Sequence, residues 1–308
     1  MSWQKALEKI IKGRAVLNEP LSRHTTFKIG GRCDCWVEPQ DRIDLKRALS
    51  FAQEKRQPVF IIGKGSNLLV KDKGWRGMVI SLSRPYFKRI EFVDEGMRVG
   101  AGLSLAALIN LTQREGLSGC EFLSGIPGTV GGAVFMNAGV RGDGLDTNRY
   151  MCIGDIVEEV KAMRLDGREA LLRKRDLKFA YRSSNLKDFI ITAVRLRLCL
   201  KKPEAIRCRI ERLWQRKKLQ QEFSRPSAGC VFRNPRASLV SAGQLIDLCG
   251  LKGLSCGQAM VSRTHANFIV NNGHAKAADV LKLIEVIREK VKKKFCLDLI
   301  PEIKIIGD

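Results

Sequence analysis

The sequence has no hydrophobic run long enough to cross a membrane, and its N-terminus lacks the features of an export signal. No stretch of 18 or more apolar residues occurs in the 308 residues, which argues against a transmembrane helix. The first 20 residues contain no apolar core and no small-residue cleavage site. They therefore do not resemble a secretory leader and instead predict a short amphipathic helix. We expect a cytoplasmic protein.

Metal-ligand and disulfide patterns are also absent. The ten cysteines include no C-x-x-C pair, and Cys33 and Cys35 enclose a single residue. The three histidines, His24, His265 and His274, form no ligand pattern with them. We expect no metal, and ten reduced thiols that act mostly as small buried hydrophobic residues.

Acidic residues are scarce relative to basic ones. The chain has 55 Lys and Arg against 32 Asp and Glu, a formal net charge of +23. This excess fits nucleic-acid binding, attraction of anionic small molecules, or a basic surface without a specific partner. The basic residues are spread along the whole chain, and aromatic residues make up only 6% of it. We therefore do not expect nucleic acid as the main partner, and the other two interpretations of the charge stay open.

Strand-like and helix-like segments alternate, which predicts an α+β or α/β protein of two or three domains with a boundary near residue 200. Ser241 is a candidate N-cap for a helix that Gly250 ends. The expected strands are Val59–Ile62, Val79–Leu82, Arg98–Gly102, Val157–Leu165, Ile190–Leu200, Phe268–Val270 and Leu299–Ile306. The expected helices are Ser104–Glu115, Ala205–Lys218, Ala242–Cys249 and Ala277–Val291.

Glycine is abundant in two segments. GKGSN at 63–67 follows an expected strand, and GIPGTVGGAVFMNAG at 125–139 contains two glycine-bearing turns within eight residues. Glycine costs backbone entropy on folding, so such runs indicate sharp turns or close approach of a ligand. Exposed backbone N–H groups, with neutral Thr129 and Asn137, suit a diphosphate-bearing cofactor. Ordinary tight turns are the alternative, and neither the P-loop nor the dinucleotide motif is present.

Three further residues are notable for their type and setting. Arg182 lies between an aromatic residue and two serines, where it is either a surface residue or a bidentate carboxylate ligand. Cys230 follows a glycine and is either packed or reactive. Glu302 interrupts an apolar strand, which places it at an exposed edge or buries it for a functional reason.

Seven segments together closely resemble the UDP-N-acetylenolpyruvoylglucosamine reductase family, also called UDP-N-acetylmuramate dehydrogenase. In chain order they are GKGSNLLV, GIPGTVGGAVFMNAG, YRSS, AGCVFRNP, AGQLIDLCGLKG, SRTHANFIVN and LIPEIKIIG. The resemblance runs from about His24 to the C-terminus. It implies an FAD- and NADPH-dependent oxidoreductase that reduces UDP-N-acetylglucosamine enolpyruvate to UDP-N-acetylmuramate. That reaction belongs to peptidoglycan precursor synthesis, and so to cell wall biogenesis, cell shape and cell division.

The resemblance implies an α+β fold with a two-part FAD-binding domain of the vanillyl-alcohol-oxidase type and a C-terminal α+β substrate-binding domain. We expect FAD-binding subdomains at 1–82 and 83–200 and the substrate domain at 201–308, with the last strand able to return to the FAD lobe. In the family the two glycine segments wrap the FAD diphosphate and flavin. The cofactor-binding residues implied here are Gly63, Gly65, Ser66, Asn67, Leu68, Gly125, Ile126, Pro127, Gly128, Thr129, Gly131, Gly132, Asn137 and Gly139.

Three residues carry over from the family as catalytic: Arg182, Cys230 and Glu302. Hydride passes from NADPH through FAD to the terminal methylene carbon of the enolpyruvyl ether. Arg182 then stabilises the enolate-like negative charge, and a protonated Glu302 donates a hydrogen bond to the same group. Cys230 protonates the neighbouring carbon, since a thiol is mostly protonated at neutral pH.

Substrate contacts carry over less directly. Lys218, twelve residues before Cys230, matches a lysine that meets the substrate diphosphate, although a solvated place on a basic helix is the alternative. His265 and Asn267 either line the site or brace it. The substrate-binding residues implied are Tyr181, Lys218, Asn234 and His265.

The chain departs from the family pattern in three places. Many members have serine where this chain has Cys230. The segment 141–154 is longer than the pattern, and no room exists between Tyr181 and Leu200 for a tyrosine-bearing loop, so the chain resembles the shorter subtype. Two alternatives remain: another flavin oxidoreductase of the same fold, and a basic nucleic-acid-binding protein on that scaffold.

Overall fold

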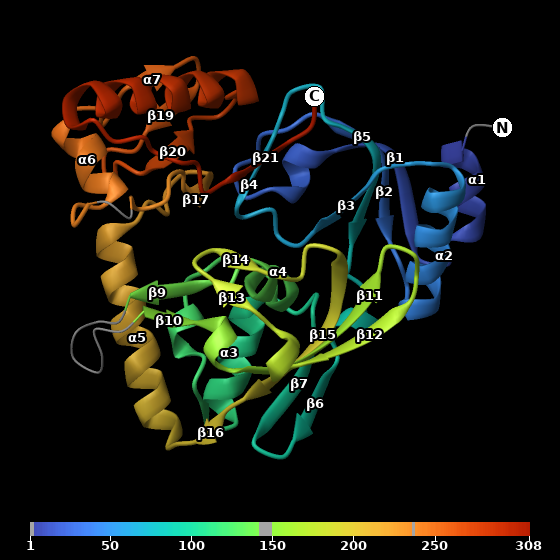
Figure 1. Ribbon diagram of the computed structural model, residues 1–308. Coiled ribbons are helices and arrows are strands. Elements are labelled where there is room, and N and C mark those ends of the chain that lie inside the picture. Colours follow the sequence, from blue (N-terminus) through green and yellow to red (C-terminus); the bar gives the residue numbers. More distant parts are fainter. Residues whose placement is uncertain (1–2, 142–149, 236–237) are drawn as a thin grey trace. The chain divides into compact units, whose positions relative to one another are not determined.

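Figure 1 shows the computed structural model of the chain, which describes residues 3–141, 150–235 and 238–308. Most of the atypical segment 141–154 therefore lies outside the described residues. Within those ranges, no helix combines the length and apolar character that crossing a bilayer requires. The chain divides into two compact units. The first comprises Met1–Leu17, Cys35–Gly63 and Gly77–Lys217, and the second comprises Asn18–Asp34, Lys64–Arg76 and Lys218–Asp308. The division at 82 and 200 stays a prediction.

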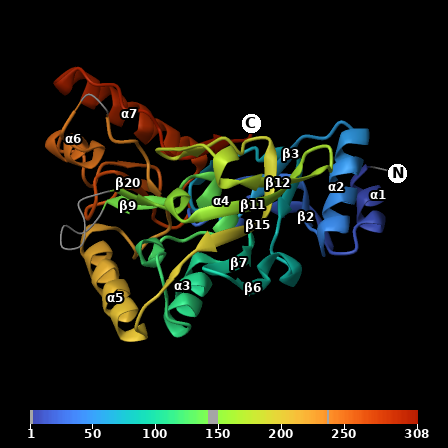
Figure 2. The same cartoon turned by 60° about the horizontal axis from the view of Figure 1, so that its bottom comes forward.

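The first unit contains a five-stranded antiparallel sheet of order β12-β11-β15-β7-β6. Its central strands contribute fully buried side chains to the core, such as Val99, Val160 and Val194. Helix α4 lies against β15 and β7 (Figure 2). The strands are β6 (Ile90–Val93), β7 (Gly96–Gly100), β11 (Val157–Arg164), β12 (Glu169–Arg173) and β15 (Phe189–Arg197); the helices of this region are α3 (Leu105–Arg114) and α4 (Val130–Phe135).

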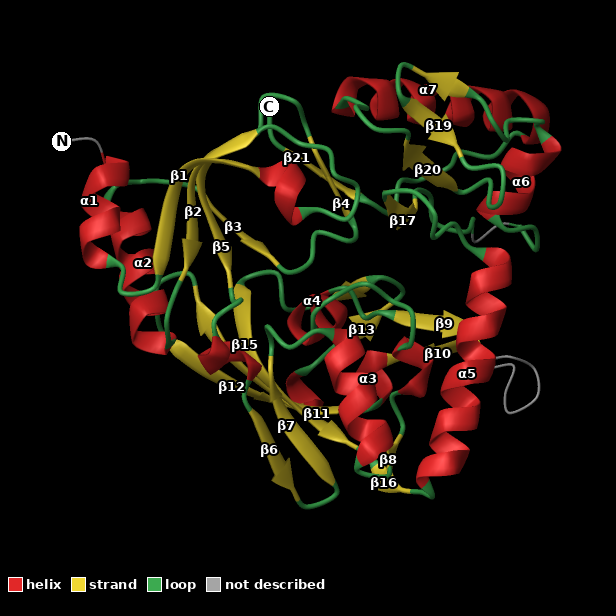
Figure 3. Ribbon diagram, turned by 180° about the vertical axis from the view of Figure 1, so that it is seen from behind, coloured by secondary structure: helices red, strands yellow, loops and turns green. Residues whose placement is uncertain are grey.

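A second sheet has the order β1-β2-β5-β3, with β3 and β5 parallel. Its strands are β1 (Arg14–Pro20), β2 (Arg32–Glu38), β3 (Val59–Ile62) and β5 (Trp75–Ser81). Helices α1 (Trp3–Ile10) and α2 (Arg42–Glu54) lie side by side beside it (Figure 3). The fully buried carboxylate of Asp44 in α2 accepts backbone N–H groups from Lys12, Gly13 and Gln40, each at 2.9 Å. One carboxylate thus joins two loops to the start of α2.

The second unit is built on the antiparallel sheet β17-β20-β19-β18, which helix α7 covers (Figure 1). The expected apolar face of α7 is confirmed, because Val280, Leu283, Ile284, Ile287 and Val291 are all buried. Strand β21 pairs in parallel with β4 in the same unit. The elements are β4 (Leu68–Val70), α6 (Ala242–Leu248), β17 (Ser227–Cys230), β18 (Ser255–Cys256), β19 (Ala259–Val261), β20 (Phe268–Asn271), α7 (Ala277–Phe295) and β21 (Lys304–Ile306).

Among the described residues, three short two-stranded pairs, a long helix and a 3-10 turn lie outside these sheets. The pairs are β9 (Gly139–Arg141) with β10 (Tyr150–Cys152), β13 (Phe179–Ala180) with β14 (Ser183–Ser184), and β8 (Leu117–Ser118) with β16 (Cys199–Leu200). The long helix α5 (Pro203–Gln220) follows β16. A 3-10 turn, η3 (Glu121–Leu123), precedes the longer glycine segment.

Most expected elements are confirmed within a few residues, and three expectations are wrong. The final strand covers only Lys304–Ile306, because Pro301 has no N–H to donate to a ladder and the N–H of Glu302 turns to Val231. The second glycine-bearing turn is instead the start of helix α4, with Thr129 as its N-cap. All ten cysteines are free as expected, but only Cys33, Cys35 and Cys120 are buried.

Candidate active site

Gly63, the first residue of the GKGSN segment, meets the longer glycine segment inside the first unit. A Cβ atom on Gly63 would lie 2.6 Å from Thr129 Oγ1, so the absence of a side chain at Gly63 permits this contact. Thr129 caps α4, because its side chain accepts the N–H of Gly132 at 3.2 Å. The predicted cofactor residues at both ends of this contact are therefore neighbours.

Part of the longer glycine segment serves packing within the protein. The N–H of Gly131 donates to the Ala101 carbonyl oxygen, and a Cβ on Gly131 would lie 2.8 Å from Ala101 Cβ. At Gly125 the space is taken by Trp214, whose ring atoms would lie 2.8 Å from a Cβ. In contrast, the backbone N–H of Thr129 has no acceptor in the part of the chain that the structure describes.

A second group of open N–H donors lies in the second unit. Gly65 is buried with a φ of 60°, and a Cβ there would lie 2.5 Å from the His24 carbonyl oxygen. Neither Gly65 nor Ser66 donates its backbone N–H to an acceptor within the described ranges. Buried amides of this kind need a partner, and the oxygens of a diphosphate are suitable acceptors. The residues present therefore fit the FAD diphosphate.

Arg182 occupies the turn of the β13–β14 hairpin in a strained conformation. Its φ is 53°, a region that non-glycine residues rarely adopt. The guanidinium donates from Nη1 to the Gly139 carbonyl oxygen at 3.1 Å and lies over the rings of Tyr150 and Tyr181. Backbone strain of this kind is concentrated at functional sites. The finding favours the functional interpretation of Arg182 over a passive surface residue.

Asn137 braces this hairpin. Its side chain is 4% exposed, donates to the Ala180 carbonyl oxygen at 3.0 Å and accepts the N–H of Gly154 at 3.0 Å. Asn137 also has a positive φ of 45°. Both ends of the amide are thus engaged with the protein, next to the residues Tyr181 and Arg182 whose position they hold.

Lys217 is a buried residue near Arg182 that no sequence motif indicates. Its side chain is 7% exposed, whereas that of the neighbouring predicted residue Lys218 is exposed. Lys217 Nζ donates to the carbonyl oxygens of Phe122, at 3.3 Å, and Ser124. Burial, and then the Arg182 charge, lower the pKa of Lys217 to about 8. The helical spacing could have revealed it, because Lys217 falls on the face that buries Ile206 and Leu213.

In the second unit, Cys230 and Glu302 lie on adjoining segments. Cys230 ends β17 and is paired with Phe268, and its side chain is half-buried. Glu302 is 8% exposed, and its N–H donates to the Val231 carbonyl oxygen at 2.7 Å. The Glu302 carbonyl oxygen in turn accepts Asn67 Nδ2 at 3.2 Å. The GKGSN segment, the Cys230 strand and the Glu302 segment therefore converge in this unit.

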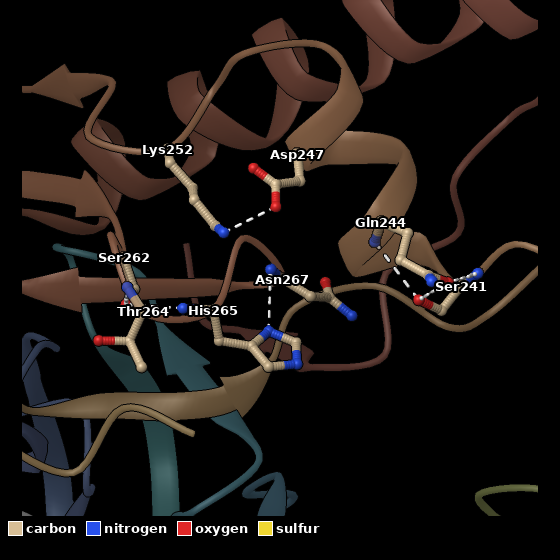
Figure 4. Close-up of polar contacts among 8 residues, drawn as sticks. All are labelled: Ser241, Gln244, Asp247, Lys252, Ser262, Thr264, His265 and Asn267. Atoms are coloured by element: carbon tan, nitrogen blue, oxygen red, sulfur yellow. Dashed lines mark hydrogen bonds and ion pairs between the residues drawn. The ribbon is translucent and has the colours of Figure 1, made fainter. Parts of the chain in front are cut away.

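His265 and Asn267 have different roles (Figure 4). Asn267 is buried and clamps the backbone of Phe232, accepting its N–H at 2.9 Å and donating to its carbonyl at 2.8 Å. His265 Nδ1 accepts the N–H of Asn267 at 3.1 Å, and burial lowers the His265 pKa. The ring is therefore neutral at pH 7, with Nε2 as the remaining donor. Asn234, by contrast, uses its side-chain oxygen to accept the Ala242 N–H at the start of α6.

The remaining predicted residues are distributed over both units. In the first unit Ile126 and Gly128 are half-buried, Pro127 and Tyr181 are exposed, and Gly139 supplies the carbonyl that Arg182 and Tyr150 contact. In the second unit Leu68 is buried in β4.

Comparison with known proteins defines the class. Residues 33–171 match the model of an FAD binding domain, and residues 220–306 match the model of the UDP-N-acetylenolpyruvoylglucosamine reductase, C-terminal domain. The chain is an FAD-binding oxidoreductase, and the expected α+β fold class with its FAD-binding and C-terminal parts is confirmed.

Individual relatives define the family. The UDP-N-acetylenolpyruvoylglucosamine reductase of Caldanaerobacter subterraneus is 41% identical over 98% of this chain and 97% of its own length. The enzyme of that name from Moorella thermoacetica is 41% identical over 98% and 96%. The crystal structure of UDP-N-acetylenolpyruvylglucosamine reductase (MurB) from Thermus caldophilus aligns with a TM-score of 0.78 at 39% identity, over 96% of this chain and all of that one. The chain belongs to the UDP-N-acetylenolpyruvoylglucosamine reductase family.

Proposed function

We propose that the protein reduces UDP-N-acetylglucosamine enolpyruvate to UDP-N-acetylmuramate in the cytoplasm, with NADPH as reductant, as a step of peptidoglycan precursor synthesis. The observation that carries the proposal is the convergence of Asn67, the Cys230 strand and Glu302 in the second unit. Three segments far apart in the sequence bring together a glycine-rich loop, a thiol and a carboxyl group. A protein whose only function was a basic surface would not need this arrangement.

FAD, when bound, supplies the chemistry of hydride transfer from NADPH to the terminal methylene carbon of the substrate. The N–H groups of Gly65, Ser66 and Thr129 are suitable donors to the diphosphate of FAD. Within the first unit Thr129 lies close to Gly63, and within the second unit Gly65 lies close to the His24 carbonyl oxygen. Because these donors are backbone groups, they need no rearrangement of side chains to bind.

Arg182 has the role of an electrostatic stabiliser. Arrival of hydride at the methylene carbon moves negative charge onto the neighbouring carbon and its carboxylate. A guanidinium presents paired N–H donors that match a carboxylate. The contact with the Gly139 carbonyl and the strained turn hold Arg182 before the substrate arrives.

Cys230 and Glu302 complete the reaction. Cys230 Sγ gives its proton to the carbon next to the carboxylate, which forms the new C–H bond and leaves a thiolate that solvent reprotonates. Glu302 donates a hydrogen bond to the substrate carboxylate when it is protonated. Tyr181, Lys218, Asn234 and His265 are proposed contacts of the UDP-sugar, with His265 Nε2 and the Asn234 amide nitrogen as available donors.

An anaerobic absorbance titration tests the function. The visible flavin band should bleach when NADPH is added and return when UDP-N-acetylglucosamine enolpyruvate is added. A band that bleaches but does not return would retain the flavoenzyme and contradict the substrate. A protein without a flavin band after incubation with FAD, and with salt-dependent retention on nucleic acid, would favour the nucleic-acid alternative.

A further inference from the structure

The ammonium group of Lys217 is a buried cation that the proposed reaction does not use. It lies on α5 and donates to two uncharged acceptors, the carbonyl oxygens of Phe122 and Ser124. No carboxylate pairs with it in the portion of the chain that the structure describes. A buried charge without a counter-charge is costly, so its retention needs a reason.

The two acceptor carbonyls lie just before the start of the longer glycine segment. In this turn the N–H of Ser124 donates to the Glu121 carbonyl and that of Ile126 donates to the Leu123 carbonyl. Within the described ranges, no backbone N–H outside regular secondary structure donates to the carbonyls of Phe122 or Ser124. Lys217 therefore satisfies both of them from outside the turn.

Helix α5 also leaves no space for a side chain at Gly125, the residue that follows this turn. Gly125 has a φ of 74°, and a Cβ there would lie 2.8 Å from the Trp214 ring and 3.2 Å from Lys217 Cδ. Trp214 and Lys217 are three positions apart and so share one face of the helix. The same face thus covers Gly125 and binds the carbonyls on either side of Leu123.

We propose that Lys217 is a positioning residue for the cofactor loop 125–129, holding the Phe122 and Ser124 carbonyls so that the loop has the conformation that binds FAD. The inference rests on the proposed assignment of this loop to FAD. Hydrogen bonds from a charged donor are roughly twice as strong as neutral ones. The positive charge on Lys217 therefore strengthens its hydrogen bonds to the two carbonyls, and deprotonation of Lys217 weakens them.

The charged surroundings allow that charge to be lost in an accessible pH range. Burial and the Arg182 guanidinium lower the pKa of Lys217 to about 8. The Glu121 carboxylate in η3 accepts Ser118 Oγ at 2.6 Å and the Gly119 N–H at 2.9 Å, and it is not among the groups that shift the pKa of Lys217. The other charged groups nearby on α5 are Arg216 and Lys218, both cations.

The test is FAD affinity, measured by quenching of flavin fluorescence on titration into the deflavinated full-length protein at pH 7 and pH 9. Lys217→Met should weaken FAD binding about tenfold or more, since hydrogen bonds to charged groups are lost. Arg207→Met removes an exposed cation of the same helix and should stay within about twofold of the wild type. The wild-type affinity should fall from pH 7 to pH 9, and that of Lys217→Met should not change.

Equal FAD affinity of Lys217→Met and Arg207→Met, or the same pH dependence in Lys217→Met and the wild type, would overturn the inference. If Lys217→Met does not fold, Lys217→Gln keeps one neutral donor and should bind FAD with intermediate, pH-independent affinity. A pH dependence retained in that variant would also overturn it. A wild-type protein that does not bind FAD at all contradicts the proposed function instead.

Discussion

The backbone N–H of Glu302 donates to the carbonyl oxygen of Val231 at 2.7 Å. This bond joins Glu302 to the residue that follows Cys230, the proposed proton donor. The Arg233 N–H donates in the other direction, to the Ile300 carbonyl at 2.9 Å, and Phe232 and Pro301 form a bridge between these two bonds. Two hydrogen bonds of opposite direction fix the register of this short ladder. The segments that carry Cys230 and Glu302 are therefore joined by backbone contacts.

Replacing Cys230 by alanine should separate the two half-reactions. Positioned general acids typically contribute roughly 10²–10⁴-fold to rate. Stopped-flow absorbance should therefore show normal reduction of the bound flavin by NADPH and a loss of that size in its reoxidation by the enolpyruvyl substrate. Cys230→Ser, which keeps a proton donor, is the matched control and should retain most of the activity. Wild-type turnover in Cys230→Ala would show that another group donates the proton.

The strained turn predicts a trade between stability and activity at Arg182. Arg182→Gly removes a positive-φ side chain and should leave the free energy of unfolding unchanged or raise it by about 1 kcal/mol. Its kcat should nevertheless fall by about 10² or more. Arg182→Lys retains the charge but loses the paired donors, so its kcat should lie between the two. Urea unfolding and steady-state kinetics measure both quantities. A glycine variant that is both less stable and fully active would contradict this account.

Burial of Lys217 predicts a specific pH dependence of stability. The pKa of Lys217 is about 8 in the folded protein, against the ordinary lysine value of 10.5 that applies to the unfolded chain. Between these pH values the unfolded chain therefore holds a proton that the folded chain has released. The Lys217 contribution to the free energy of unfolding therefore rises with pH across this window, by up to about 3 kcal/mol, and is lost as the pH falls through 8.

The measurement is urea unfolding of the FAD-free protein at several pH values, taken as the difference between the wild type and Lys217→Met. Taking a difference is necessary because the pKa of the buried Cys33 and Cys120 thiols is raised to about 12. Those thiols make the stability fall with pH in the same window, and they do so equally in both proteins. A difference that is flat between pH 8 and 10.5 would mean that Lys217 is not held as a buried charge.

The close approach of Gly125 to Trp214 predicts that a substitution of Trp214 partly restores FAD binding to a Gly125 variant. Gly125→Ala places a methyl group 2.8 Å from two ring carbons, at a φ that alanine tolerates poorly. FAD binding should weaken about tenfold. Trp214→Leu alone should have a smaller effect, and the double variant should recover part of the loss because the ring is gone. Purely additive losses in fluorescence titrations would indicate that the φ of Gly125, and not the ring, is limiting.

The sequence predicts single elements well where the periodicity and the caps are local. The face of α7 and the Ser241 cap of α6 are such cases, because each depends on residues within a few turns. The strand expected at Leu299–Ile306 fails for a tertiary reason. Pro301 and Glu302 pair with the segment after Cys230, and only Lys304–Ile306 pairs with β4. An apolar pattern does not reveal such a change of partner within one run.

For the candidate site, residue types at motif positions predict which side chains matter but not what each one contacts. Gly125 was expected to leave room for a cofactor, yet its missing Cβ is also required by Trp214, which is 89 positions later in the chain. Asn137 and Asn267 carry amides that are fully engaged with backbone groups. The family resemblance selects Lys218, and no motif marks the neighbouring Lys217, whose burial is exceptional for a lysine.

The parallel pairing of β21 with β4 joins residues 304–306 to residues 68–70. Growth of the chain on the ribosome therefore leaves β4 without this partner until residues 304–306 have been made. The first unit needs nothing beyond Lys217, so it can assemble while synthesis continues. The GKGSN segment, the thiol of Cys230 and the carboxyl of Glu302 can come together only after translation of the last strand. These three groups should thus come together later than the first unit assembles, as a separate folding step.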